Sequence, residues 1–172
     1  FGVVATDDSG AANDTSAPTT VTITITGTND QPTLSVVDTS GDMDEGDGAA
    51  TISDSGSLSF DDIDTNDIVT VSQTYNNDIV WSGGALDGTV AAALVAGFSV
   101  DQDSWDYTSS ETLDFLRDGE TITFSFGVVA TDDSGAANDT SAPTTVTITI
   151  TGTNDQPTLS VVDTSGDMDE GD

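Results

Sequence analysis

The stretch TITFSFGVVATDDSGAANDTSAPTTVTITIT, residues 121–151, decides the fold class of this chain. Every second residue over 122–128, and again over 146–150, is Ile, Phe or Val, and the residues between them are small or polar. A period of two predicts strands that each bury one face. The Asp133-Ser134-Gly135 sequence between them is typical of a turn. We therefore expect two half-buried antiparallel strands here.

Shorter segments of the same kind precede this stretch. They predict strands at Thr33–Val37, Gly56–Phe60, Ile68–Tyr75, Ile79–Ser82 and Trp105–Thr108. Together these segments make about seven strands separated by turn residues, which favours an all-β fold, an antiparallel Greek-key β-sandwich. The Ala-rich segment Val90–Phe98 is the exception and predicts one or two helical turns.

The sequence also contains a long internal repeat. Residues 1–47 recur unchanged as residues 126–172, a period of 125 residues. A fixed period of domain size is typical of a tandem array. We expect residues 1–29 to be the last strands of a preceding repeat, residues 30–154 to be one complete repeat, and residues 155–172 to start the following one. Neighbouring repeats of the same protein are then the first expected partners.

Residues 1–29 have the pattern of closing strands with an unpaired apolar edge. Two interpretations stay open. The strands could add to the sheet of another copy of the chain, or the sequence simply begins within a domain.

Charge excludes several classes of function. The formal net charge is −31, with 32 acidic residues and Arg117 as the one Lys or Arg. Binding of nucleic acid or of an anionic membrane surface needs basic patches, and no apolar stretch is long enough to predict membrane insertion. The absence of His and Cys removes most hydrolase chemistries, so we expect no enzyme. We expect Arg117 to pair locally with Asp114 or Asp118.

Acidic clusters stand where the predicted strands end. They lie at residues 29–30, 42–45, 61–67, 101–103 and 132–133. Ca²⁺ prefers carboxylate, amide and backbone oxygens, so the clusters predict Ca²⁺ as the cofactor. An EF-hand loop starting at Asp62 is excluded. Such a loop needs Gly at its sixth position and Glu at its twelfth, and this chain has Asp67 and Gln73 there. The alternative is that these acids are solvated loop residues that keep the array soluble.

The two tryptophans of the repeat give weaker signals. Trp105 lies in a predicted strand, and we expect it in the core. For Trp81 two interpretations stay open, packing in the core and stacking on carbohydrate. A pair of carboxylates for glycoside hydrolysis would need a cleft with more aromatic residues than these two.

These motifs resemble the VCBS repeats, a cadherin-like family found in tandem in giant bacterial surface proteins, including adhesins with RTX-type secretion signals. The strand running into TGTNDQP, from Val21 and again from Val146, is the most recognisable part. The segments LSFDDIDTNDIVTVS, SWDYTSSETLDFL and DGETITFSFGVVATDDSG follow in that family's order. The resemblance covers about residues 30–154 and both flanking fragments.

The more distant similarity to cadherins implies roles for single residues. Cadherin junctions hold Ca²⁺ with a first-strand Glu, a linker of D-x-N-D-N type, a D-x-D motif and an A-x-D-x-G-like motif. The matching metal ligands are Glu45, the linker residues Asn29 and Asp30 with their copies Asn154 and Asp155, the pair Asp62 and Asp64, and Asp132. The chain departs from the linker pattern at Gly27 and Gln31, so fewer side-chain oxygens reach the junction.

The resemblance therefore implies a non-catalytic, calcium-stabilised structural repeat in the extended shaft of a bacterial adhesin or extracellular filament, with Ca²⁺ making the interdomain junctions rigid. Its location would be extracellular, at the bacterial cell surface. The alternative from another class is an adhesion module that binds glycan or protein.

Overall fold

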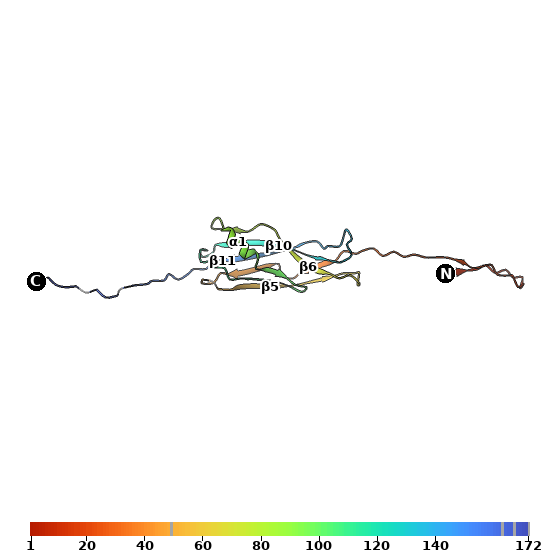
Figure 1. Ribbon diagram of the computed structural model, residues 1–172, viewed down its shortest axis with the longest axis horizontal. Coiled ribbons are helices and arrows are strands. Elements are labelled where there is room, and N and C mark those ends of the chain that lie inside the picture. The colour runs from red at the N-terminus through yellow and green to blue at the C-terminus, as the bar shows by residue number, and fades with distance from the viewer. Residues whose placement is uncertain (49, 163, 167, 172) are drawn as a thin grey trace.

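The computed structural model describes residues 1–48, 50–162, 164–166 and 168–171. It contains one β-sandwich with an extended arm at each end (Figure 1). The N-terminal and C-terminal arms leave the sandwich from opposite ends, so the molecule is elongated along its strands.

One sheet of the sandwich is built from β4 (Ser40–Asp44), β6 (Thr70–Tyr75), β7 (Val80–Trp81), β10 (Thr121–Thr131) and β11 (Thr144–Thr151). Its order is β4-β11-β10-β6, and β7 also pairs with β10. The pairings are antiparallel except that of β4 with β11, which is parallel.

The other sheet is built from β3 (Thr33–Val36), β5 (Ile52–Asp61), β8 (Phe98–Val100) and β9 (Ser104–Ser109). Its order is β3-β5-β9-β8, and every pairing is antiparallel. The chain enters this sheet as β3 and then crosses to the opposite sheet as β4. This arrangement is an immunoglobulin-like Greek-key β-sandwich, so the predicted fold class is confirmed.

The structure has two strands in the sandwich that the sequence did not predict, β4 and β8. Strand β4 reads SGDMD and buries only Gly41 and Met43, so its apolar pattern is too weak to detect. Strand β8 (Phe98–Val100) begins at the last residue of the segment predicted as helical, Val90–Phe98, and its other two residues belong to no predicted element. Helix α1 instead spans Gly88–Val95. Asp87 caps its N-terminus, because the Asp87 carboxylate accepts hydrogen bonds from the N–H groups of Thr89 and Val90.

The core forms where the two sheets face each other. The alternating residues of β10 and β11 are at most 3% exposed, as predicted. Phe98 of β8 stacks on Phe126 of β10 with ring centroids 4.1 Å apart, and on Trp105 of β9 at 5.8 Å. Trp105 is fully buried, and its indole N–H donates to the Asp38 carbonyl at 2.7 Å. This hydrogen bond ties the Trp105 ring to the turn between β3 and β4.

The N-terminal arm contains a small hairpin of its own. Strands β1 (Gly2–Val3) and β2 (Thr19–Thr20) pair with each other, and the hairpin lies away from the sandwich (Figure 1). Residues 33–151 thus supply all strands of the sandwich among the described residues.

We predict that Gly56→Ala destabilises the domain and that Gly127→Ala does not. Gly56 pairs with Trp105, and a Cβ there would lie 2.6 Å from Trp105 Cε2. The indole is held by its hydrogen bond and cannot move away, so overpacking should cost about 1–3 kcal/mol. Urea unfolding would measure the loss.

Gly127→Ala is the matched control, because it is also a strand glycine but its Cβ would meet nothing closer than 3.7 Å. Its effect should stay within about 0.5 kcal/mol. Equal losses in the two variants would contradict the packing described for Trp105.

Candidate functional site

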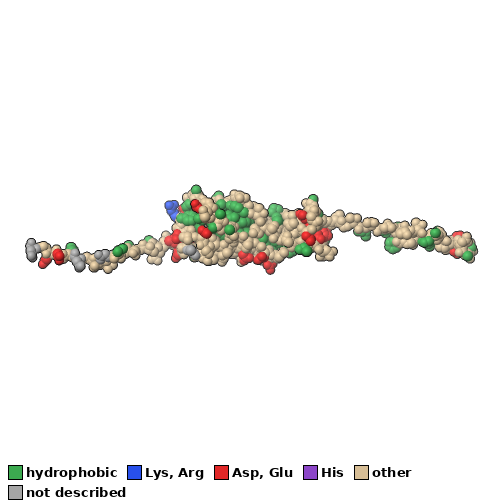
Figure 2. All heavy atoms as spheres, viewed as in Figure 1, with side chains coloured by type: hydrophobic (Ala, Val, Ile, Leu, Met, Phe, Trp, Pro, Cys, Tyr) green, Lys and Arg blue, Asp and Glu red, His purple; other side chains and the backbone are tan. Residues whose placement is uncertain are grey.

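The predicted ligands gather at the two ends of the sandwich. We call the end that carries the N-terminal arm the N-terminal pole; it holds Asn29, Asp30, Asp62, Asp64 and Asp132. The opposite end, the C-terminal pole, holds Glu45, Asn154 and Asp155. Acidic side chains are visible at both ends in Figure 2.

At the N-terminal pole, the linker is tied to the loop that follows β5. Asp62 Oδ1 accepts from the Asp64 backbone N–H at 2.9 Å, which folds the D-x-D segment into a turn. Asp64 Oδ2 then accepts from the Asp30 backbone N–H at 2.7 Å. The D-x-D segment and the linker, 34 residues apart in sequence, are therefore in direct contact.

The same linker also contacts the loop between β10 and β11. Asn29 Nδ2 donates to Asp132 Oδ2 at 3.2 Å, and Asn138 Nδ2 donates to the Asn29 carbonyl at 2.9 Å. Asp132 is only 5% exposed. Hydrogen bonds from the Ser134 side chain and backbone, and from Asn29, hold the pKa of Asp132 below its ordinary value despite burial. Asp132 is thus kept ionised.

Two oxygens at this pole are buried without a hydrogen-bond partner, Asn29 Oδ1 and Asp62 Oδ2. A cavity of about 390 Å³ is lined by Asn29, Asp64 and Asp67, among others. Burial raises the pKa of Asp67, and the carboxylates of Asp64, Asp132, Asp133 and Asp62 raise it further. Asp67 was not among the predicted ligands, although it belongs to the same acidic run over residues 61–67.

At the C-terminal pole, Glu45 is the central group. Its backbone N–H donates to the Thr151 carbonyl at 2.8 Å, which continues the β4–β11 pairing past the end of β4. Its side chain is turned inward and the residue is 5% exposed. Oε1 accepts from the Thr153 N–H at 3.2 Å, whereas Oε2 has no partner.

The electrostatic surroundings of Glu45 are negative. Burial raises the pKa of Glu45, the Thr153 N–H opposes this, and the carboxylates of Asp155, Asp114 and Asp47 raise it further. Burial also raises the pKa of Asp155, with Asp47 and Asp114 adding to the effect. These acids meet because three chain segments, those following β4, β9 and β11, end at the same pole.

Sequence reasoning missed Asp47 and Asp114 as members of this group. Asp114 Oδ1 accepts from the Gly48 N–H at 2.9 Å, and both acids line a cavity of about 710 Å³ together with Asp155. Asn154 donates from Nδ2 to the Asp155 carbonyl at 3.1 Å and does not line this cavity. No local signal marks Asp114, because its neighbours at this pole lie far away in sequence.

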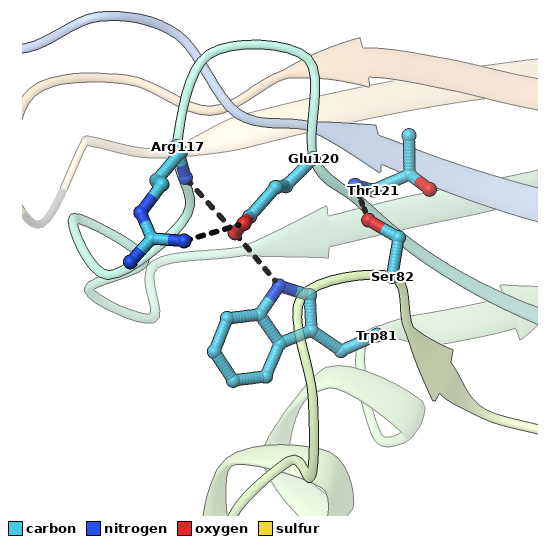
Figure 3. Close-up of polar contacts among 5 residues, drawn as sticks. All are labelled: Trp81, Ser82, Arg117, Glu120 and Thr121. Carbon is cyan, nitrogen blue, oxygen red and sulfur yellow. Dashed lines mark hydrogen bonds and ion pairs between the residues drawn. The ribbon is translucent and has the colours of Figure 1, made fainter.

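The prediction that Arg117 pairs with Asp114 or Asp118 is wrong. Arg117 contacts Glu120 with an N–O distance of 3.5 Å (Figure 3). A tight turn brings Glu120 back, because the Glu120 N–H donates to the Arg117 carbonyl at 2.8 Å. The one basic side chain of the sequence is therefore engaged with Glu120.

Trp81 lies beside this turn and is half-buried. Its indole N–H donates to Glu120 Oε2 at 3.2 Å (Figure 3), and its ring packs edge to face against Phe115 with centroids 5.0 Å apart. It also lines an apolar cavity of about 260 Å³ with Leu86 and Val90. Part of the ring is thus used in packing, and stacking on carbohydrate stays an untested alternative.

Within the described residues, no three acidic side chains lie close enough to hold a metal ion by themselves. Each pole instead offers carboxylates, amide and backbone oxygens, and buried oxygens without partners. This donor set fits a hard cation such as Ca²⁺, which takes about six to eight oxygen ligands from side chains and backbone alike. Whether the eight predicted residues bind a metal stays a prediction.

Comparisons with known proteins support the fold alone. No protein-family model and no curated protein sequence matches this chain. Among solved structures, it is similar to the ASH / PapD-like domain of human CEP192 (PapD-like domain 7), with a TM-score of 0.50 and 10% sequence identity, over 80% of this chain and 99% of that one. In the part of the chain that the structure describes, no helix is long and apolar enough to cross a membrane.

We predict that the chelator-treated protein becomes more stable as the pH falls from neutral toward 4.5, the ordinary pKa of Glu. A group whose pKa is raised by folding binds protons more tightly in the native state, so acidification through that pKa stabilises the fold. The pKa of Asp132 is lowered by folding, so protonation of Asp132 destabilises the fold, but only at a pH below this range. Thermal unfolding across this range measures the effect.

Glu45→Gln separates the contribution of Glu45 from that of the remaining acids. The amide keeps the shape and removes the titrating charge, so the melting temperature of this variant should rise less on acidification. An identical pH profile in the variant and the wild-type protein would show that folding does not raise the pKa of Glu45.

Proposed function

We propose that this chain is a non-catalytic, calcium-stabilised structural repeat of VCBS type, from the shaft of an extracellular bacterial adhesin or filament. The resemblance of its motifs to that family supports the proposal, as do the acidic poles. Neighbouring repeats are its partners, and Ca²⁺ makes the junctions between them rigid.

The observation that carries the proposal is the environment of Glu45. A buried carboxylate is costly unless it is paired. Here one oxygen has no partner, and the charged groups that act on Glu45 are the carboxylates of Asp155, Asp114 and Asp47. A divalent cation would satisfy the free oxygen and reverse the repulsion.

The sequence repeat supports a site shared between repeats. Asn29 and Asp30 at one pole occupy the same place in the period as Asn154 and Asp155 at the other. In an array, the Glu45 pole of one repeat and the Asp62, Asp64 and Asp132 pole of the next would therefore meet at one linker. Ligands from the neighbouring repeat would then add to those that each pole already offers.

The proposed mechanism is mechanical. Without Ca²⁺, the carboxylates at a junction repel each other and the linker bends. With Ca²⁺, the ion clamps the end of one sandwich to the loops of the next. The two arms already leave from opposite ends (Figure 1), which suits a linear shaft. Extracellular modules typically bind Ca²⁺ with dissociation constants of about 10⁻⁴–10⁻³ M.

We predict that millimolar Ca²⁺ raises the melting temperature of the chain relative to chelator. With an affinity in that range, a few millimolar Ca²⁺ would stabilise the native state by about 1–2 kcal/mol, a shift of a few degrees. Scanning calorimetry and sedimentation would measure stability and extension.

Three variants test where the ion binds. Glu45→Gln and Asp64→Asn should each reduce the calcium shift, since each removes a charge from one pole. Asp106→Asn is the matched control, because Asp106 lies on β9 between the poles and is exposed; its shift should equal that of the wild-type protein. Equal melting temperatures in Ca²⁺ and chelator, with an unchanged hydrodynamic radius, would refute the proposal.

A further inference from the structure

An apolar cavity lies beside Trp81 and shares no residue with the cavities at the two poles. It has a volume of about 260 Å³ and is lined by Trp81, Ala85, Leu86, Asp87, Val90 and Phe115. The surrounding segment carries little charge, because residues 79–100 contain Asp87 as their one acidic residue in a chain with 32. Figure 2 shows apolar side chains gathered on this part of the sandwich.

The Trp81 ring is held in a fixed position at this cavity. Its indole N–H donates to Glu120 Oε2 at 3.2 Å, and its ring packs edge to face against Phe115. The backbone at Gly83 passes close to the ring, since a Cβ there would lie 2.6 Å from Trp81 Cε2. Figure 3 shows the six-membered ring directed away from Glu120. A carboxylate bonded to the indole N–H pushes electron density into the ring, and that density attracts a cation over the ring face.

Asp87 supplies a carboxylate at the same cavity. Its Oδ1 accepts from the N–H groups of Thr89 and Val90 at 2.8 and 3.4 Å. These bonds, with one from the Thr89 side chain, hold the pKa of Asp87 below its ordinary value, so the carboxylate is ionised at neutral pH. Its full charge outweighs the positive end of the helix dipole, which is worth roughly half a unit charge. The cavity is therefore negative at Asp87.

The lining disfavours two classes of ligand and favours a third. A Ca²⁺ ion takes about six to eight oxygen ligands, whereas all lining residues except Asp87 are apolar. A sugar ring needs several hydrogen-bonding side chains for its hydroxyl groups, and this cavity offers Asp87 alone. An alkylated ammonium ion matches the whole lining, because its alkyl groups are apolar and its charge suits both the aromatic ring and the carboxylate.

We propose that this cavity binds a small alkylated ammonium compound, with the ammonium group over the Trp81 ring and beside the Asp87 carboxylate. The net charge of −31 raises the concentration of cations near the surface. Arg117 does not repel the ligand, because its charge is offset by its ion pair with Glu120. The site does not depend on the calcium sites proposed at the poles, since it shares no residue with them.

Choline and a neutral isostere test the proposal in the full chain. The isostere is the alcohol in which a tert-butyl group replaces the trimethylammonium group, so the two ligands differ in charge and not in shape. Ligand-observed NMR detects the methyl signal of each. Chelator removes calcium, and about 0.15 M NaCl screens the exposed charges. We expect choline to bind roughly three- to thirtyfold more tightly than the isostere, the range for a cation over an aromatic ring.

Three variants locate the binding. Asn caps a helix as well as Asp does, so Asp87→Asn should stay folded and reduce the preference for choline severalfold. Trp81→Leu keeps an apolar wall without the aromatic ring and should reduce the preference at least as much. Asp106→Asn removes an exposed charge from β9 and should retain the full preference. The near-ultraviolet signal of the buried Trp105 reports the folding of each variant.

Three results would overturn the proposal. The first is no binding of choline, or equal binding of choline and its isostere, in the wild-type protein. The second is a full preference for choline in both Asp87→Asn and Trp81→Leu, because the acidic surface as a whole would then attract the cation. The third is tighter binding of methyl glucoside than of choline, which would favour carbohydrate recognition instead.

Discussion

Burial of the alternating side chains of β10 and β11 is the interaction on which the rest of this structure depends. Strand β10 pairs with β11 on one side and with β6 and β7 on the other, and β11 also holds β4. The same two strands end at the poles: Asp132 follows β10, and Thr153, Asn154 and Asp155 follow β11. The packing of the core therefore sets the positions of the acids, whose carboxylate charges repel one another.

Sequence reasoning reached the fold because a period of two in the apolar residues specifies both a strand and its buried face. It failed for β4, where only Gly41 and Met43 face inward, since a glycine gives no apolar signal. It also placed Phe98 in a helix, because a short Ala-rich run followed by an aromatic residue does not show where a helix ends. These features depend on tertiary packing rather than on local preference.

The candidate site also contains residues that the sequence identified and residues that only the folded structure brings together. The D-x-D spacing singled out Asp62 and Asp64, and the resemblance to cadherin junctions implied Glu45. Asp114 and Asp47 could not be found, since they approach Glu45 only when the connections after β4 and β9 reach the same pole. For Arg117 the sequence suggested a partner that the structure does not use. Proximity in sequence pointed to Asp114 or Asp118, but the turn places Glu120 beside Arg117.

The parallel pairing of β4 with β11 has a consequence for tension. The pairing runs over five residue pairs, from Ser40 with Thr147 to Asp44 with Thr151. Strand β11 leads directly into the C-terminal arm, and β4 is connected to the N-terminal arm through β3. A pull on the two arms would act along these strands and slide them past each other. The hydrogen bonds between them would then be strained together rather than opened one after another, so this edge of the sheet would resist stretching more than a hairpin pulled apart from its ends.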